Sequence, residues 1–173
     1  MPIDTLLRQL DQAYDRRSWH GTNLRGSLRN VSPELAAWRP SPGRHNIWEL
    51  AVHAAYWKYA VWRRLSGAAR GSFPRAGSNW FTRPEAATDE AWRADLALLG
   101  DMHRRLRGAV AALPPRDLPR IPRGAATTHA DLIAGIIAHD LYHAGQIQLL
   151  KRLAPAAARS KNARRASGWV RSL

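Results

Sequence analysis

The sequence predicts one all-α domain built as a four-helix bundle. Four segments place apolar residues three and four positions apart, as one face of a helix requires, and loops rich in proline and glycine separate them. No segment shows the alternation of apolar and polar residues that is typical of a strand. The 173 residues suffice for one domain with a substantial core. We expect residues 1–153 to form the bundle and residues 154–173 to form a basic, flexible C-terminal tail.

The first helix is expected to begin near Ile3, because an apolar stripe with helical spacing runs from there to Tyr14. The Trp19-His20-Gly21 step should bend or break this helix. Leucines continue the stripe beyond the step, and Val31-Ser32-Pro33 ends it.

The second helix is expected to begin after Asn46. Asn46 and Glu49 have the spacing of a capping box, in which the two residues satisfy each other's backbone N–H groups. The apolar positions continue to Leu65, and Gly67 provides a C-terminal stop. The long loop at 68–87 contains three aromatic residues, Phe73, Trp80 and Phe81, which predict that it packs against another part of the molecule.

The third helix opens at Thr88-Asp89-Glu90, where acidic residues favour the positive end of the helix dipole, and Pro114-Pro115 ends it. The fourth helix begins near Thr127 or Thr128 and runs to Leu153, just before Ala154-Pro155. Two short connections and one long one join the four helices, which fits a bundle.

The composition excludes some functions and weakens others. The chain has no cysteine, so disulfides and thiolate metal ligands are excluded, and a reducing cytoplasm is the expected location. No apolar run is long enough to cross a bilayer, and no secretory signal is visible. The formal net charge of +14 raises nucleic acid as a partner. However, the basic residues are scattered except after Leu153, so a solvated basic surface is the preferred interpretation.

A histidine pair marks the expected functional face of the fourth helix. At 100° per residue, one arc contains His139, His143 and several apolar residues, so we expect this arc to be buried. Two imidazoles one turn apart are close enough to share a metal ion. In a chain with seven histidines such a pair also arises by chance, and the alternative is a pair of packed core histidines.

His53 on the second helix offers a third ligand, because bundles commonly assemble metal sites from facing helices. Three imidazoles suit zinc, nickel, iron or copper and disfavour magnesium and calcium, which prefer oxygen. Three protein ligands would leave coordination positions open, as catalytic sites do. We expect a divalent transition metal, most readily zinc or nickel, bound by His53, His139 and His143.

These segments resemble a known family. The stretch His139-Asp140-Leu141-Tyr142-His143-Ala144-Gly145-Gln146, together with Ile47-Trp48-Glu49-Leu50-Ala51-Val52-His53, resembles the DinB-like (DinB/YfiT) superfamily, and Trp19-His20-Gly21 resembles one subgroup of it. The resemblance covers about residues 3–153. It implies an up-and-down four-helix bundle, commonly a homodimer, in a bacterial cytoplasm. It also implies that the three matching histidines hold a divalent metal, and that relatives include transferases using low-molecular-weight thiols.

Four further residues are candidates for the site. Glu49 lies one turn before His53 and is a candidate to orient a ligand or to carry a proton, although helix capping explains it equally well. His20 is a candidate catalytic residue at the mouth of the bundle, with a surface histidine as the alternative. Trp57 and Gln146 are candidates for the substrate pocket, since both lie on the histidine faces of their helices.

Two other residues have weaker roles in this interpretation. Asp140 is expected either to support an imidazole or to pair with an arginine, and Tyr142 is expected to contact another helix.

Three functions remain open from the sequence. The leading one is a metal-dependent enzyme of the thiol S-transferase or hydrolase type, in which the metal activates a thiol or water against a small-molecule substrate. The second is a non-enzymatic metal- or ligand-binding protein connected with stress. The third, a basic nucleic-acid binder, is the least favoured.

Overall fold

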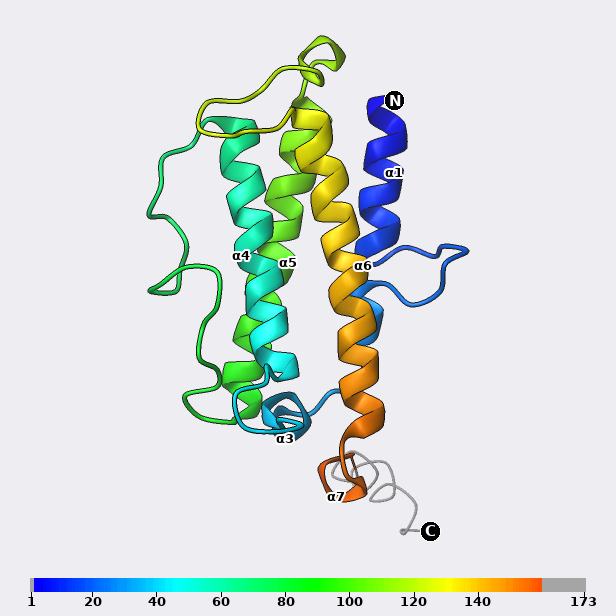
Figure 1. Cartoon of the computed structure of the whole chain (residues 1–173), viewed down its shortest axis with the longest axis vertical. Helices are drawn as coiled ribbons and strands as arrows, with labels where there is room; N and C mark the ends of the chain where they lie inside the picture. The colour runs from blue at the N-terminus through cyan, green and yellow to red at the C-terminus, as the bar shows by residue number, and fades with distance from the viewer. Residues whose placement is uncertain (1, 160–173) are drawn as a thin grey trace, which may run out of the picture.

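The structure, a computed structural model, describes residues 2–159, and all regular secondary structure in this range is helical. In chain order the elements are α1 (Ile3–Tyr14), α2 (Leu24–Ser27), α3 (Pro33–Ala37), α4 (Ile47–Ser66), α5 (Asp89–Ala112), the 3-10 turn η1 (Pro115–Asp117), α6 (His129–Leu153) and α7 (Ala156–Arg159). The predicted all-α fold is confirmed (Figure 1). Within this range no helix is both long and apolar enough to cross a membrane.

The four long helices α1, α4, α5 and α6 lie alongside one another, but their directions do not simply alternate (Figure 1). Near the start of α4, the Trp48 indole N–H donates to Asp95, near the start of α5, at 2.7 Å. At the other end of the bundle, Leu6 of α1 packs in one apolar cluster with Val110 of α5 and Ile133 of α6. Therefore α4 and α5 run parallel, while α1 and α6 run in the opposite direction.

The parallel arrangement explains the long loop at 68–87. Antiparallel neighbours can be joined by a short turn, but parallel neighbours need a segment that returns along the full length of the bundle. Figure 1 shows this segment descending beside α4 from its C-terminal end to the start of α5. Arg75 and Arg83 of the loop anchor it by donating to the buried carboxylate of Asp95, from Nη2 atoms at 2.6 Å in both cases.

The helix ends follow the predicted signals except at the start of α4 and at the end of the first helix. Asn46 caps α4 by accepting from the Glu49 N–H at 2.8 Å, but the Glu49 side chain binds other groups instead of completing a capping box. A complete capping box occurs at α6, between Thr128 and Asp131. The first helix ends at Tyr14, and the expected continuation past Gly21 forms the short separate helices α2 and α3.

The core contains a buried ion pair that joins α4 to α6. Lys58 donates to Asp140, and both side chains are 0% exposed. The Lys58 ammonium also lies 5.0 Å from the Tyr14 ring centre. The Tyr14 ring stacks on the His103 ring, with the two ring centres 3.7 Å apart. Asp140 therefore pairs with a lysine, not with one of the many arginines.

The start of the predicted tail is packed where the structure describes it. Ala154 is buried, and Ala158 in α7 packs against the main apolar cluster. Most of the predicted basic tail, from residue 160 onward, lies outside the described residues, so the domain boundary at 153 stays a prediction.

Candidate metal centre

Three histidines from two helices meet at one point. His53 comes from α4, and His139 and His143 come from α6, where they lie one turn apart. The Nε2 atom of His139 lies 3.2 Å from Nε2 of His53 and 3.1 Å from Nε2 of His143. One ligand atom from each residue falls within 4.8 Å of the others, and among the described residues this is the group of histidines and carboxylates that could hold a metal ion.

The buried face of α6 is rotated from the predicted one. Its buried positions include Ile133, Asp140 and Ala144, whereas His139 is only half-buried. The centre of this face lies about 50° from the centre of the predicted arc, at 100° per residue. As a result His139 lies at the margin of the bundle core, whereas His143 is buried.

Hydrogen bonds fix the tautomers of two of the rings. The Nδ1–H of His53 donates to the backbone carbonyl of Asn79 at 2.8 Å, and the Nδ1–H of His143 donates to Oε1 of Gln146 at 2.7 Å. The Trp57 indole N–H donates to the side-chain oxygen of Asn79 at 2.9 Å and so holds Asn79 in place. In a neutral ring with its proton on Nδ1, the Nε2 atom presents a lone pair, as metal ligation requires.

The electrostatic environment keeps the rings neutral. Burial first, and then repulsion from the neighbouring imidazoles, lowers the pKa of His53 to about 4 and that of His139 to about 3. Burial likewise lowers the pKa of His143. At neutral pH all three rings are therefore uncharged and free to act as ligands.

The donor set fits a transition metal ion. With Nδ1–H on His53 and His143, the three converging Nε2 atoms share at most one proton, carried by His139, so at least one lone pair has no partner. A cation at the centre would satisfy all three. In a tetrahedral zinc site with Zn–N bonds of about 2.0–2.1 Å, ligand nitrogens lie about 3.3–3.4 Å apart, close to the separations of 3.1 and 3.2 Å found here.

Trp80 from the loop at 68–87 covers one side of the centre. Its indole lies between two imidazoles, 3.8 Å from the ring centre of His53 and 3.6 Å from that of His45, nearly parallel to both. The aromatic residues of this loop predicted that it packs, but not that Asn79 or Trp80 would contact the site, because a loop lacks the periodicity that assigns helical residues to a face.

Glu49 does not contact the three histidines in the described structure. Its carboxylate accepts from Arg39 Nη1 at 2.9 Å, from the His45 ring at 3.0 Å and from the backbone N–H of Arg83 at 3.3 Å. Burial alone would raise the pKa of Glu49, but these hydrogen bonds outweigh burial and lower it. The side chain is thus an ionised acceptor whose bonding capacity is already used.

His20 lies on an exposed loop away from the centre. Its ring contact is with Trp19, itself 95% exposed. The same loop touches α6 through Thr22, which accepts from Gln148, and position 148 lies about 140° around the helix from His143. The structure therefore does not bring His20 together with the three ligands.

Two grooves flank the histidines. One, of about 520 Å³, is lined by Trp57, Ile136 and His139, and the other, of about 530 Å³, by Trp80, His143 and Gln146. The two residues expected in the pocket, Trp57 and Gln146, thus each line a groove that is also lined by one of the three histidines. Tyr142, expected to contact another helix, is instead 63% exposed and lines the second groove, because the buried face of α6 is rotated away from it.

Comparison with known protein families matches residues 6–147 to the DinB superfamily. The matched range extends from α1 through most of α6, and it includes all three histidines and the loop at 68–87. No curated protein and no solved structure gives a significant match to the chain.

Proposed function

The chain belongs to the DinB superfamily, and on that premise we propose that it binds one divalent transition metal and acts as a metal-dependent enzyme on a small molecule. The observation that carries the proposal is the convergence of three neutral imidazoles, two of them buried and one half-buried, from α4 and α6. Zinc or nickel is the proposed ion, and iron and copper also suit three imidazole ligands.

His53, His139 and His143 would hold the metal, and a three-ligand set leaves coordination positions for other molecules. When bound, the metal would supply Lewis acidity, which favours the anionic form of a thiol or of water. The two grooves beside His139 and His143 are the proposed routes for a substrate. A low-molecular-weight thiol and an electrophile, or a molecule to be hydrolysed, are the proposed reactants.

The surrounding residues orient the ligands and shield them. Asn79 and Gln146 keep Nε2 of their histidine partners free of a proton, and Trp80 limits access of water to His53. Glu49 is proposed as a positioning residue that holds His45 against Trp80, because its carboxylate binds the His45 ring. The proposal gives His20 no part in the metal centre.

Metal analysis tests the first half of the proposal. The purified protein, stripped with chelator and reloaded with zinc or nickel, should retain one ion per chain. His53→Ala, His139→Ala and His143→Ala should each lose it, while His20→Ala, a change of the same kind on an exposed loop, should keep it. Retention of the ion by all three ligand variants would refute the site.

Activity assays test the second half. The metal-loaded protein should turn over members of a panel of thiol-transfer and ester- or amide-hydrolysis substrates, and His139→Ala should abolish the turnover. Metal binding without turnover across the panel would favour the alternative function, a non-enzymatic metal- or ligand-binding protein. We also propose, from the family and not from a contact in the structure, a homodimer in a bacterial cytoplasm; light scattering of the purified protein tests the dimer.

A further inference from the structure

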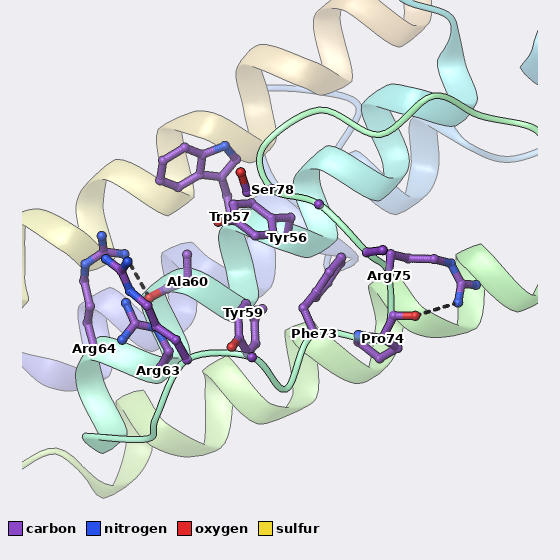
Figure 2. A pocket seen from close by; sticks show the side chains of 14 residues that line it. Tyr56, Trp57, Tyr59, Ala60, Arg63, Arg64, Phe73, Pro74, Arg75 and Ser78 are labelled. Carbon is purple, nitrogen blue, oxygen red and sulfur yellow. Dashed lines mark hydrogen bonds between the residues drawn. The ribbon is translucent and has the colours of Figure 1, made fainter.

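A third hollow is lined by Trp57 but by none of the three histidines. It has a volume of about 720 Å³, within the range typical of small-molecule sites, and it opens between the C-terminal half of α4 and residues 70–78 of the loop. Figure 2 shows side chains of both segments turned toward this space. The metal centre does not use the cavity, so its lining needs a separate explanation.

The charge of the lining is entirely positive. Arg63, Arg64 and Arg70 border the cavity, and no acidic residue does. Within residues 2–159 none of the three forms an ion pair, and Arg64 donates only to the backbone carbonyl of Ala60, at 3.1 Å. Arg75, also at the cavity, differs because its guanidinium is committed to Asp95 and points away from the other arginines (Figure 2).

The helix dipole explains only part of this cluster. A basic residue in the last turn of a helix interacts favourably with the carbonyl end, and Arg63 and Arg64 lie in the last turn of α4. Arg70, however, lies beyond the helix on the loop, and it lines the same space. Moreover Arg63 and Arg64 are half-buried, where a guanidinium without a counter-ion loses hydration that an anion would replace.

Another part of the cavity lining is aromatic. Tyr56, Trp57 and Phe73 line it, and the Tyr56 and Phe73 rings meet edge to face with centres 5.4 Å apart. Such a wall favours the apolar part of a ligand, because rings and chains lose water on contact with it. Inorganic anions alone would leave this wall unused.

We propose that this cavity binds a small organic anion, whose carboxylate or phosphate group pairs with Arg63, Arg64 and Arg70 and whose apolar part lies against Tyr56 and Trp57. Arginine suits both oxyanions because its planar fork offers paired donors. Trp57 and Arg64 also line the groove beside His139, so the proposed anion site and that groove share these two residues of α4. The proposed anion site does not depend on the metal.

Calorimetric titration of the chelator-treated, metal-free full chain tests the proposal. The probes are phenyl phosphate, benzoate, inorganic phosphate and phenol. We expect phenyl phosphate or benzoate to bind at least tenfold more tightly than inorganic phosphate, and phenol not to bind measurably. The two aromatic acids distinguish a phosphate site from a carboxylate site. Equal affinity for phenyl phosphate and inorganic phosphate would overturn the role of the aromatic wall.

Charge-matched variants separate a built site from general attraction to a chain of net charge +14. Arg63→Gln/Arg64→Gln should weaken binding roughly tenfold or more. Arg8→Gln/Arg93→Gln, which removes the same charge from exposed positions on α1 and α5, should leave it within about twofold. If the first double variant fails to fold by circular dichroism, Arg70→Gln on the exposed loop takes its place. Equal losses in test and control variants, or no binding by the wild type, would overturn the site.

Discussion

Removing Lys58 should destabilise the protein far more than removing an exposed ion-pair partner. In Lys58→Met the Asp140 carboxylate keeps its fully buried position but loses its only hydrogen-bond donor within the described residues, since its Oδ1 already has none. Breaking a buried pair in this way costs about 3–5 kcal/mol, because one charge stays uncompensated away from water. That is a large fraction of the roughly 5–15 kcal/mol by which domains are stable.

Urea unfolding of the metal-free protein, followed by circular dichroism, measures this loss. The matched control is Arg107→Met, which removes the cation of the Arg107–Asp11 pair between α5 and α1; both of its side chains reach solvent, so its loss should stay below about 1 kcal/mol. Lys58→Met/Asp140→Leu should recover most of the stability, since it removes both charges. Similar losses for Lys58→Met and Arg107→Met, or a double variant no more stable than Lys58→Met, would refute the reasoning.

Three further predictions concern other parts of the molecule. Burial lowers the pKa of His103 to about 2, so between about pH 6.5 and 2 the unfolded chain binds a proton that the folded chain does not, and stability falls as the pH falls. The free energy of unfolding should fall between pH 8 and pH 5 by about 2 kcal/mol less in His103→Phe than in the wild type, as measured by denaturant unfolding. An equal fall in both proteins would contradict the prediction. Gln146→Leu should weaken zinc binding about 10–100-fold by releasing the His143 tautomer, with Gln146→Glu retaining an acceptor and most of the affinity, as measured by competition with a chelator. Asp95→Asn should free the loop at 68–87 from its anchor, so limited proteolysis should cut there faster than in the wild type, and unchanged cutting would count against that anchor.

The sequence carried enough information for the helices and for the three histidines. Apolar periodicity and capping residues such as Asn46 and Thr128 locate helix starts to within a residue or two, because these signals are local. The pairing of His139 with His143 is equally local. His53 was proposed as the third ligand because bundles assemble sites from facing helices, and the family resemblance implied the same residue. Periodicity alone assigns a residue to a face but does not say which face it meets.

Other features depended on three-dimensional packing that no local pattern specifies. Periodicity has no direction, so it could not show that α4 and α5 run parallel. The rotation of the buried face of α6 follows from pairing Asp140 with Lys58, a contact 82 residues apart in the chain. Asn79 reaches His53 from a loop that is anchored at Asp95 and held by Trp57, and these contacts could not be predicted from loop composition.

The parallel course of α4 and α5 has a consequence for how this protein can vary. The connection that this topology demands is also the segment that supplies Asn79 and Trp80 to the histidines and a wall to the arginine-lined cavity. Residues in the middle of this loop can be exchanged, which would change the choice of ligand. The two ends of the loop stay fixed by α4 and α5. Shortening the segment has a limit, because α4 has 20 residues, a length of roughly 30 Å, and about ten extended residues are needed to return along it.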